Sequence, residues 1–391
     1  MTDYLLSEIA EIVDCEHKTA PKVEVSEYLS VRTTDISNGR LNYENANRVS
    51  EKIYFEWIKR ATPEPGDIIL AREAPVGEAG WIDTGYKVCL GQRTVLIKIH
   101  HNEVYKKFAL YYLVNPETKY DLQSRSTGSV VAHLNMKDIR AFEISLPPLP
   151  EQKAIASVLS SLDDKIDLLH RQNKTLEAMA ETLFRQWFVE EARDDWEEGS
   201  LFGIIDLLGG GTPKTSIPEY WDGSIPWLSG GDIASNHKSF VQDTPKHITE
   251  KGLCNSSAKL LPKYATVISA RGTVGKYCML SQPMAFSQSN YGILPKNSEN
   301  YFFTYLLINH VVEELQSSAY GSVFDTITTA TFKELEVLLP PMEEIFQFEN
   351  SVSSFFEKML LNNTQIRTLE KLRDTLLPKL MSGEVRVKYE H

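Results

Sequence analysis

The sequence predicts an α+β protein in which one arrangement occurs twice. We expect two domains, each with a curved mixed β-sheet and short helices, separated by an antiparallel coiled coil of two long helices. Three observations predict this fold class: a Leu-Pro-Pro join recurs, two long segments carry a heptad pattern, and the segments before the joins are rich in short β-like runs. Together they indicate a pseudo-twofold internal repeat.

The repeat is clearest at Leu146-Pro147-Pro148, which recurs as Leu339-Pro340-Pro341, an offset of 340 − 147 = 193 residues. Gly128 and Gly321 each lie 19 residues before the first proline of their join, so the register continues upstream without a gap. A repeat of this length is too long for a solenoid unit and indicates a duplicated domain with its helix.

This register divides the chain into four segments. Residues 1–146 form the first domain, 147–195 a central helical spacer, 196–339 the second domain, and 340–391 a C-terminal helical spacer. Short β-like runs at 67–70, 88–99 and 266–270 are broken by Gly, Pro and Asn, and short helical patterns occur at 104–114 and 301–315. Such mixtures favour a compact α+β domain in each half.

Each spacer carries apolar residues at alternating steps of four and three, which is a heptad seam. If the two helices pack antiparallel with aligned ends, Asn173 meets Asn362 and Arg373 lies beside Asp163. Two buried asparagines that meet satisfy each other, which favours pairing within one chain. The alternative places both at solvated edges of independent helices. The expected structural seam residues are Leu162, Leu169, Asn173, Leu176, Phe355, Asn362, Ile366 and Leu369.

Helices of about 40 residues are roughly 60 Å long, so the pair is expected to hold the two domains apart. Pro378 should distort or end the second helix, and Ser382-Gly383 should supply its stop.

Composition and charge narrow the function. A chain of 391 residues with 42% hydrophobic and 24% charged residues is typical of a globular protein of two to three domains. No signal peptide or membrane-length apolar run is expected, and the four scattered cysteines predict neither a zinc site nor disulfides, so the cytoplasm is the expected compartment. The net charge is −12 and none of the four segments is basic. Binding DNA would therefore require charge sorted by face, or partners that supply it.

The sequence lacks the motifs of common catalytic sites. The Gly-rich segments 209–214 and 272–276 do not form a phosphate loop, because Pro213 precedes Lys214 and Tyr277 follows Lys276. Hydrolase, dinucleotide and amino-methyltransferase motifs are also missing. His133 has no carboxylate or cysteine near it in sequence and is expected to be a loop or core histidine. We expect no catalytic residue and no metal site.

Several motifs together resemble the specificity (S) subunits of type I restriction-modification systems. The resemblance rests on Gly209-Gly210-Gly211-Thr212-Pro213, Ile225-Pro226-Trp227 and Gly231-Asp232-Ile233, on the Leu-Pro-Pro-x-x-Glu joins, and on the helix ends at 183–188 and 376–384. It spans nearly the whole chain in the family's order of recognition domain, helix, recognition domain, helix. The first half lacks the G-G-T-P opening, so its base-contacting residues are harder to assign.

The resemblance implies a non-catalytic DNA-recognition subunit with two target recognition domains, which binds a bipartite, asymmetric site in double-stranded DNA. It implies partners: two adenine methyltransferase (M) subunits along the helices and, in the restricting complex, restriction/translocase (R) subunits. That assembly would be an ATP-dependent type I site-specific endonuclease and adenine-N6 DNA methyltransferase. S-adenosylmethionine, ATP and Mg would bind the partners, no cofactor would bind this chain, and no membrane is involved.

Two other functions stay open. The chain could be a protein-interaction scaffold with a coiled-coil spacer, or a cryptic nuclease or methyltransferase.

Candidate DNA contacts come from loops that occur in both halves. Arg72 and Arg271 each precede a Val-Gly, and bidentate arginine is the commonest specific contact to guanine; the alternative is a salt bridge that shapes the loop. Gln92, Arg93, Gln288 and Asn290 lie in or after β-like runs, where the amide side chains can hydrogen-bond to adenine or cap a turn. The expected set is Arg32, Thr33, Thr34, Arg72, Gln92, Arg93, Ser126, Thr127, Ser129, Ser229, Arg271, Gln288, Asn290, Tyr320 and Ser322.

Overall fold

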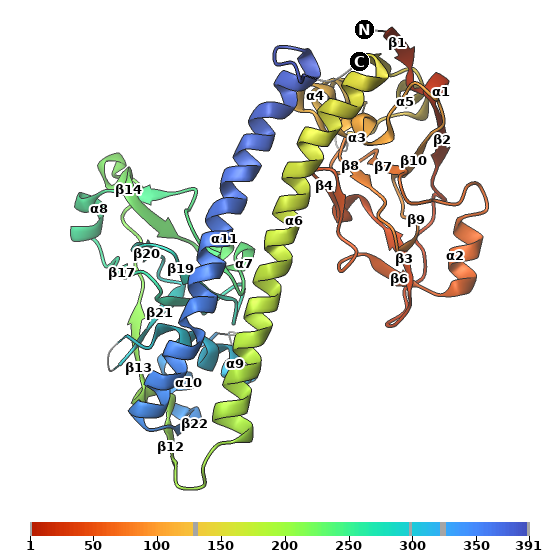
Figure 1. The fold of residues 1–391 in the computed structure, drawn as a ribbon. Helices are drawn as coiled ribbons and strands as arrows, with labels where there is room; N and C mark the ends of the chain where they lie inside the picture. Colours follow the sequence, from red (N-terminus) through yellow and green to blue (C-terminus); the bar gives the residue numbers. More distant parts are fainter. Residues whose placement is uncertain (1, 128–131, 297–298, 321–325, 389–391) are drawn as a thin grey trace. The chain divides into compact units, whose positions relative to one another are not determined.

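The computed structural model describes residues 2–127, 132–296, 299–320 and 326–388, and its elements are a mixture of helices and strands (Figure 1). Its contacts divide the chain into two compact units, the first comprising Met1–Lys165 with Leu369–His391 and the second Ile166–Thr368. Each unit therefore contains one β-rich domain and a part of both long helices. The mixed helix and sheet class is confirmed. The two units cut across the four segments predicted from the sequence, because each unit takes parts of both helical spacers. The four segments therefore stay a prediction.

The elements of the first domain, in chain order, are β1 (Thr2–Leu5), α1 (Leu6–Ile9), β2 (Ala10–Asp14), β3 (Tyr28–Val31), η1 (Thr33–Asp35), β4 (Ile36–Ser37), β5 (Arg40–Leu41), β6 (Asn47–Val49), α2 (Glu51–Trp57), β7 (Ile68–Ala71), β8 (Ala79–Trp81), β9 (Lys87–Leu90), β10 (Thr94–Ile99), α3 (Lys106–Val114), α4 (Pro116–Ser124), α5 (Met136–Arg140) and β11 (Glu143–Leu146).

Two main sheets form the first domain. One is antiparallel with the order β2-β10-β7-β8, and the other has the order β6-β3-β9 with β3 and β9 parallel. A ribbon of β1 and β11 pairs Thr2 with Leu146 and so ties the chain start to the first Pro-Pro join. The single curved sheet expected from the sequence is thus two sheets, because the Gly and Pro breaks divide the β-like runs into short strands.

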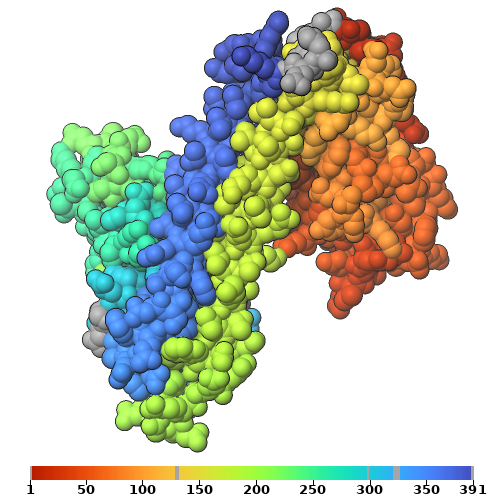
Figure 2. All heavy atoms as spheres, viewed as in Figure 1, coloured from red at the N-terminus to blue at the C-terminus, as the bar shows by residue number. Residues whose placement is uncertain are grey.

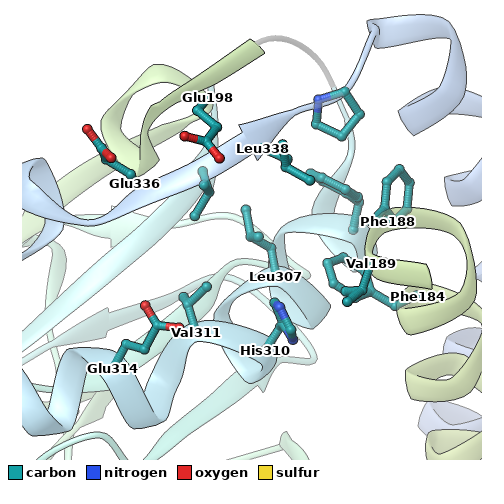
Figure 3. Close-up of a pocket in the computed structure, with 13 residues that line it drawn as sticks. Phe184, Phe188, Val189, Glu198, Leu307, His310, Val311, Glu314, Glu336 and Leu338 are labelled. Atoms are coloured by element: carbon teal, nitrogen blue, oxygen red, sulfur yellow. The ribbon is translucent and has the colours of Figure 1, made fainter. Parts of the chain in front are cut away.

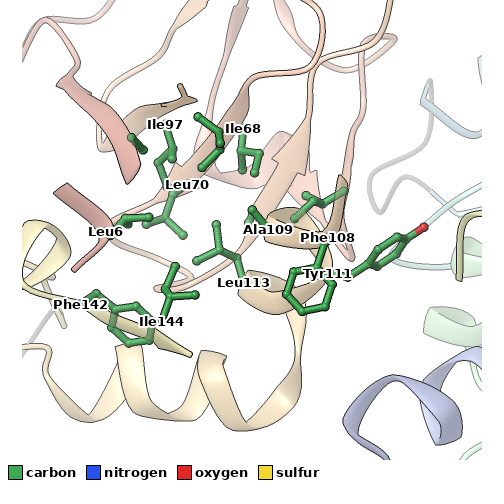
Figure 4. Close-up of a cluster of buried hydrophobic side chains, with 14 of the residues drawn as sticks. Leu6, Ile68, Leu70, Ile97, Phe108, Ala109, Tyr111, Leu113, Phe142 and Ile144 are labelled. Atoms are coloured by element: carbon green, nitrogen blue, oxygen red, sulfur yellow. The ribbon is translucent and has the colours of Figure 1, made fainter. Parts of the chain in front are cut away.

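Strand β7 serves two cores because successive side chains point to opposite faces. Ile68 and Leu70 belong to the cluster that contains Phe108 of α3 (Figure 4), whereas Ile69 and Ala71 belong to a second cluster on the other face. The first cluster also takes in side chains from the long helices, namely Ile155, Ala156, Leu159, Leu377, Leu380 and Met381.

The elements of the second domain are β12 (Glu197–Ser200), η3 (Leu201–Gly203), β13 (Ile205–Gly209), η4 (Pro218–Tyr220), β14 (Trp221–Leu228), α7 (Gly230–Ser235), β15 (Phe240–Val241), β16 (His247–Ile248), α8 (Glu250–Cys254), β17 (Leu260–Leu261), β18 (Thr266–Ser269), β19 (Tyr277–Leu280), β20 (Met284–Phe286), β21 (Asn290–Pro295), α9 (Tyr301–Tyr320), α10 (Thr329–Glu334) and β22 (Glu336–Leu339).

The second domain also has two main sheets. Their orders are β13-β21-β18-β19-β15 and β16-β14-β20-β17, and each contains one parallel pair. Ile268 of β18 faces the cluster that contains α9, whereas its neighbour Val267 faces the cluster that contains Phe286. The strand alternation of the first domain is therefore repeated here.

The long helices are α6 (Leu149–Arg185), which continues into a π-helical turn, η2 (Gln186–Glu190), and α11 (Met342–Ser382). Within the second unit they lie side by side (Figure 2), and Asn362 Nδ2 donates to Asn173 Oδ1 at 2.8 Å. Further along, the rings of Phe184 and Phe348 lie 5.9 Å apart, so the two segments run antiparallel. The expected contact between the asparagines is confirmed, but they do not satisfy each other, because Asn173 Nδ2 donates to Asn363 Oδ1 at 2.6 Å.

Within the first unit, Arg373 Nη1 donates to Asp163 Oδ1 at 3.0 Å, as the sequence predicted. Among the predicted seam residues, Leu169, Asn362 and Ile366 are buried, and Leu162, Asn173, Leu176, Phe355 and Leu369 are half-buried.

Pro378 does not end α11, which continues to Ser382. The last turn is held because Leu377 and Leu380 are buried in the core of the first unit. The helix stops where Gly383 adopts a φ of +75°, a conformation that glycine reaches without steric cost. No helix in the described part of the chain is long and apolar enough to cross a membrane.

Candidate nucleic-acid interface

Four loop segments of the first domain meet at one place. Thr33 Oγ1 donates to the Ala74 carbonyl at 3.1 Å, and the Arg72 amide donates to the Arg93 carbonyl at 2.8 Å. The Leu134 amide then donates to the Arg72 carbonyl at 3.0 Å. Segments around residues 33, 72–78, 91–93 and 133 therefore form one cluster, which contains most of the residues selected from the sequence of this half.

The second domain builds a similar cluster. Thr273 Oγ1 donates to the Gly230 carbonyl at 3.3 Å, and the Ala270 amide donates to the Ser289 carbonyl at 3.0 Å. Thr212, in the Gly-rich opening segment, donates to the side-chain oxygen of Gln288.

The loop between β7 and β8 has the same backbone frame as the loop between β18 and β19. In the first, the Gly77 amide donates to the Ala71 carbonyl at 3.0 Å; in the second, Gly275 donates to Ser269 at 2.9 Å.

Side chains brace this loop in the same way. Gln123 Nε2 donates to the Val76 carbonyl at 3.1 Å, and Gln316 Nε2 donates to the Val274 carbonyl at 2.9 Å. The two loops therefore align residue by residue, 71–78 with 269–276.

This alignment corrects one pairing made from the sequence. Arg72 is equivalent to Ala270, and Arg271 is equivalent to Glu73. Matching the two arginines required a gap of one residue that the backbone does not have. The two domains therefore present different chemistry at equivalent loop positions.

Arg72 is only 5% exposed, and its guanidinium donors are used within the domain. Nε donates to the Leu134 carbonyl at 3.0 Å, Nη1 pairs with Asp14 Oδ1 at 2.7 Å, and Nη2 lies 2.8 Å from His133 Nε2. This geometry agrees with the alternative weighed from the sequence, in which the arginine shapes the loop.

His133 has a carboxylate partner that its sequence neighbours did not reveal. Its Nδ1 lies 2.6 Å from Glu73 Oε1. Because arginine can only donate, Nε2 accepts from Arg72, and the ring proton sits on Nδ1 and is donated to Glu73. The other oxygen of Glu73 pairs with Arg93 Nε at 2.8 Å, and Arg93 is 55% exposed. A chain of polar contacts thus leads from the buried Arg72 to the exposed Arg93.

The remaining candidates of the first domain differ in accessibility. Arg32 donates through Nε and Nη2 to Asp35 at 2.9 and 2.7 Å, and Thr33 is buried. Thr34 is exposed. Gln92 is exposed and donates to the His17 carbonyl at 3.3 Å.

In the second domain, Arg271 is exposed, and its guanidinium has no partner among the described residues. Gly272 beside it has a φ of +77° and open space around its Cα. Ser229 caps α7 by accepting from the Asp232 amide, and Asn290 is buried, with Nδ2 donating to Ser287 Oγ at 2.8 Å.

Ser126 and Thr127 lie beside the loop at 133, and the Thr127 amide donates to the His133 carbonyl at 2.9 Å. Ser129, Ser322 and the side chain of Tyr320 lie outside the described residues. Their predicted roles stay predictions.

One group of described residues has side chains spaced as metal ligands would be: Asp14, Cys15 and His17. Asp14 is already paired with Arg72 at 2.7 Å and with His17 at 3.2 Å. Burial raises the pKa of the Cys15 thiol, which keeps it protonated at neutral pH. The group is therefore a poor cation site.

A pocket of about 310 Å³ in the second unit has a floor of Phe184, Phe188 and Leu307 (Figure 3). Exposed carboxylates of Glu198, Glu314 and Glu336 surround it, so its field repels phosphate. We assign this pocket no part in contact with nucleic acid.

Known proteins are similar to this chain in sequence and in fold. The family profile described as the type I restriction modification DNA specificity domain matches residues 1–178 and 193–371. The type I restriction enzyme MjaIX specificity subunit of Methanocaldococcus jannaschii is 26% identical, covering 99% of this chain and 94% of that protein. The type I restriction enzyme HindI specificity subunit of Haemophilus influenzae is 23% identical, and the match covers 74% of this chain and 80% of that protein. The crystal structure of a type I restriction-modification S subunit from M. genitalium has a TM-score of 0.59 at 17% identity, covering 97% of this chain and 95% of that one. It shares the fold.

Proposed function

We propose that this chain, which belongs to the type I restriction modification DNA specificity domain family, is the non-catalytic DNA-recognition subunit of a type I restriction-modification complex. One observation carries the proposal: the two domains present different side chains on the same loop frame. A protein that reads two unlike half-sites needs this arrangement, because the frame positions the loops and the side chains specify the bases.

The site that we propose is bipartite and asymmetric, with one half-site for each domain. The first loop cluster presents the exposed Arg93, held by Glu73, and the second presents the exposed Arg271 and Gln288, so the two clusters supply unlike sets of donors and acceptors. These groups can distinguish base pairs in the major groove, where each pair has its own pattern.

We further propose that α6 and α11 form an antiparallel coiled coil related by the pseudo-twofold repeat, and that two M subunits bind along it. Apolar residues exposed on these helices support a protein contact: Leu168 and Met179 on α6 are 40% and 45% exposed, and Leu361 on α11 is 50% exposed. R subunits would join the restricting complex in the cytoplasm. S-adenosylmethionine, ATP and Mg would bind the partners.

The net charge of −12 fits this role if partner subunits supply part of the phosphate clamp. The chain alone should then bind DNA weakly, and the complex with M should bind strongly with a steep dependence on salt.

The test is a methylation map at base resolution, in a host without other adenine methylation, of cells that express the M subunit with or without this chain. We expect an adenine mark at one bipartite motif only when the chain is present. No new mark from an assembled complex would overturn the proposal and favour the protein-interaction scaffold.

An exchange of residues 1–146 for the corresponding domain of another family member sharpens the test. We expect one half-site to change and the other to stay. A change in both halves would contradict separate reading by each domain.

A further inference from the structure

The three arginines of the first loop cluster differ in the donors that they leave free. Reading guanine requires two parallel N–H groups of one guanidinium. Arg32 has committed Nε and Nη2 to Asp35, and Arg72 has committed Nε, Nη1 and Nη2. Arg93 uses only Nε, and no described residue accepts from its Nη1 or Nη2. Its two terminal nitrogens are therefore available.

Arg93 is also held in place at both ends. The Gly91 amide donates to the Val31 carbonyl at 2.8 Å, and a Cβ on Gly91 would lie 2.4 Å from that oxygen, so only glycine allows this approach. The Arg93 carbonyl accepts from the Arg72 amide at 2.8 Å. At the tip of the side chain, Glu73 Oε2 pairs with Arg93 Nε at 2.8 Å. A side chain fixed before binding loses less entropy when it meets its ligand.

The carboxylate of Glu73, which pairs with Arg93, is itself held by further contacts. Glu73 is 17% exposed, and its second oxygen accepts from His133, which is fixed by Arg72, which is fixed in turn by Asp14. Four contacts of 2.6 to 2.8 Å therefore connect the domain interior to the Arg93 guanidinium.

The backbone at Arg93 is in the left-handed region, with a φ of +67°. Glycine or asparagine takes this conformation at lower cost. The strain of placing an arginine here therefore suggests that its side chain has a function. The frame of the second domain places Ser289 at this position, Ala270 at that of Arg72 and Arg271 at that of Glu73. The braced arginine is therefore a property of the first domain alone.

We propose that Arg93 is a specificity-determining residue that reads a guanine in the half-site bound by the first domain. Glu73 and His133 are positioning residues that hold its Nη1 and Nη2 outward. This inference rests on the proposed function, and it adds the base, the residue that reads it and the half-site.

The experiment uses the purified complex of this chain with its M subunit. Its affinity is measured for duplexes that carry the mapped motif, and for duplexes with each single base-pair substitution. For Arg93→Ala we expect discrimination at one G·C pair of one half-site to fall roughly tenfold to hundredfold. Other positions should stay as in the wild type. Arg93→Lys should lose most of the same discrimination, because lysine cannot bind guanine bidentately.

Arg60→Ala is the matched control. Arg60 is 50% exposed and pairs through Nε with Glu16 at 3.2 Å, as Arg93 pairs with Glu73, but its Nη1 is bound to the Cys15 carbonyl at 3.2 Å. We expect the complex with Arg60→Ala to recognise the same DNA motif as the wild type. Glu73→Gln should loosen discrimination at the same base pair as Arg93→Ala and to a smaller extent, a readout that a purely structural role would not move.

Three results would overturn the inference: a uniform loss of affinity that leaves the motif intact, relaxation in both half-sites, or relaxation at a pair without guanine. If Arg93→Ala does not assemble with M, Arg93→Lys decides by the same criteria. Failure of the proposed function would look different, because the wild-type chain would then produce no motif.

Discussion

Both units pack their domain on the long helices through an apolar core, but the first unit adds a charged cluster at Asp163, whereas the core of the second unit is rich in aromatic rings. Asp163 on α6 accepts from Tyr111 Oη at 2.6 Å and from Arg373 at 3.0 Å. In the second unit, Phe356 on α11 stacks on Phe302, with ring centroids 4.5 Å apart, and meets Tyr305 at 5.6 Å.

The difference shows that one arrangement of domain and helix can rest on two kinds of interaction. A half-buried ion pair adds directional constraints but carries a desolvation cost, so both partners must be present. Aromatic packing is less directional and depends on filled volume. The two units should therefore respond differently to mutation and to pH.

Phe356→Ala should have the largest effect. It removes a ring that is 1% exposed and leaves a cavity, so we expect the second unit to lose about 3–5 kcal/mol of stability. Hydrogen exchange measured by mass spectrometry should become faster in β18 and β21, while β7 and β10 keep their protection. Phe346→Ala is the control, because Phe346 is 61% exposed and should change stability by less than about 0.5 kcal/mol. Equal loosening of both units would contradict the comparison.

Asp163→Ala should destabilise the first unit by about 2–3 kcal/mol, since the Tyr111 hydroxyl and Arg373 Nη1 lose this acceptor, although Arg373 still donates to Asp374. Arg373→Ala should cost about the same. In a double-mutant cycle the two losses should not add, because each change already breaks the pair. Faster exchange is expected in β7 and β10. Additive losses would mean that the pair does not act as one interaction.

The second unit should lose stability as the pH rises. Burial, with the neighbouring Glu181 carboxylate, raises the pKa of Glu177 to about 7, and burial raises that of Glu349 to about 7, although the amides of Phe302 and Phe303 oppose this. Both folded values exceed the ordinary 4.5, so the stabilisation is complete below pH 4.5 and is lost as the pH rises through 7.

Urea unfolding between pH 5 and 8 measures this effect, and Glu177→Gln should flatten the fall by on the order of 1–2 kcal/mol. Glu190→Gln, on the exposed π-helical turn, is the control. A pH dependence that the Glu177 variant leaves unchanged would refute the assignment.

The asparagine contact should show the smallest net effect. Asn362→Leu alone leaves Asn173 Oδ1 without this donor, which should cost about 1 kcal/mol. Replacing both asparagines with leucine should return stability only to within about 1–2 kcal/mol of the wild type, because two apolar groups then meet but Asn363 Oδ1 loses its donor, Asn173 Nδ2. Thermal unfolding of the single and double variants is the measurement. A double variant less stable than either single variant would show that the asparagines contribute more than the one hydrogen bond between them.

Local patterns in the sequence predicted the frame of the molecule. The Pro-Pro joins mark the starts of α6 and α11, and the heptad steps located the meeting of Asn173 with Asn362. Pro378 was a weaker guide, because a proline can remain in a helix whose last turn is held by buried side chains.

The roles of the arginines could not be predicted in this way. The partners of Arg72 are Asp14 and His133, which are 58 and 61 residues away in the chain, so its burial depends on the tertiary fold. The pairing of Arg72 with Arg271 was wrong because residue identity, rather than backbone hydrogen bonding, guided the alignment. Arg93 was selected for its type, and only the structure shows which of its nitrogens are free.

The loop at 71–78 and its counterpart at 269–276 are held by hydrogen bonds to main-chain carbonyls, most of them from main-chain amides. Amides and carbonyls are present whatever side chain a residue carries. Mutations at exposed positions such as 93 and 271 can therefore accumulate with little harm to folding, and each can change the preferred DNA sequence. A lineage could acquire a new target in a few substitutions and pass through intermediates that remain folded.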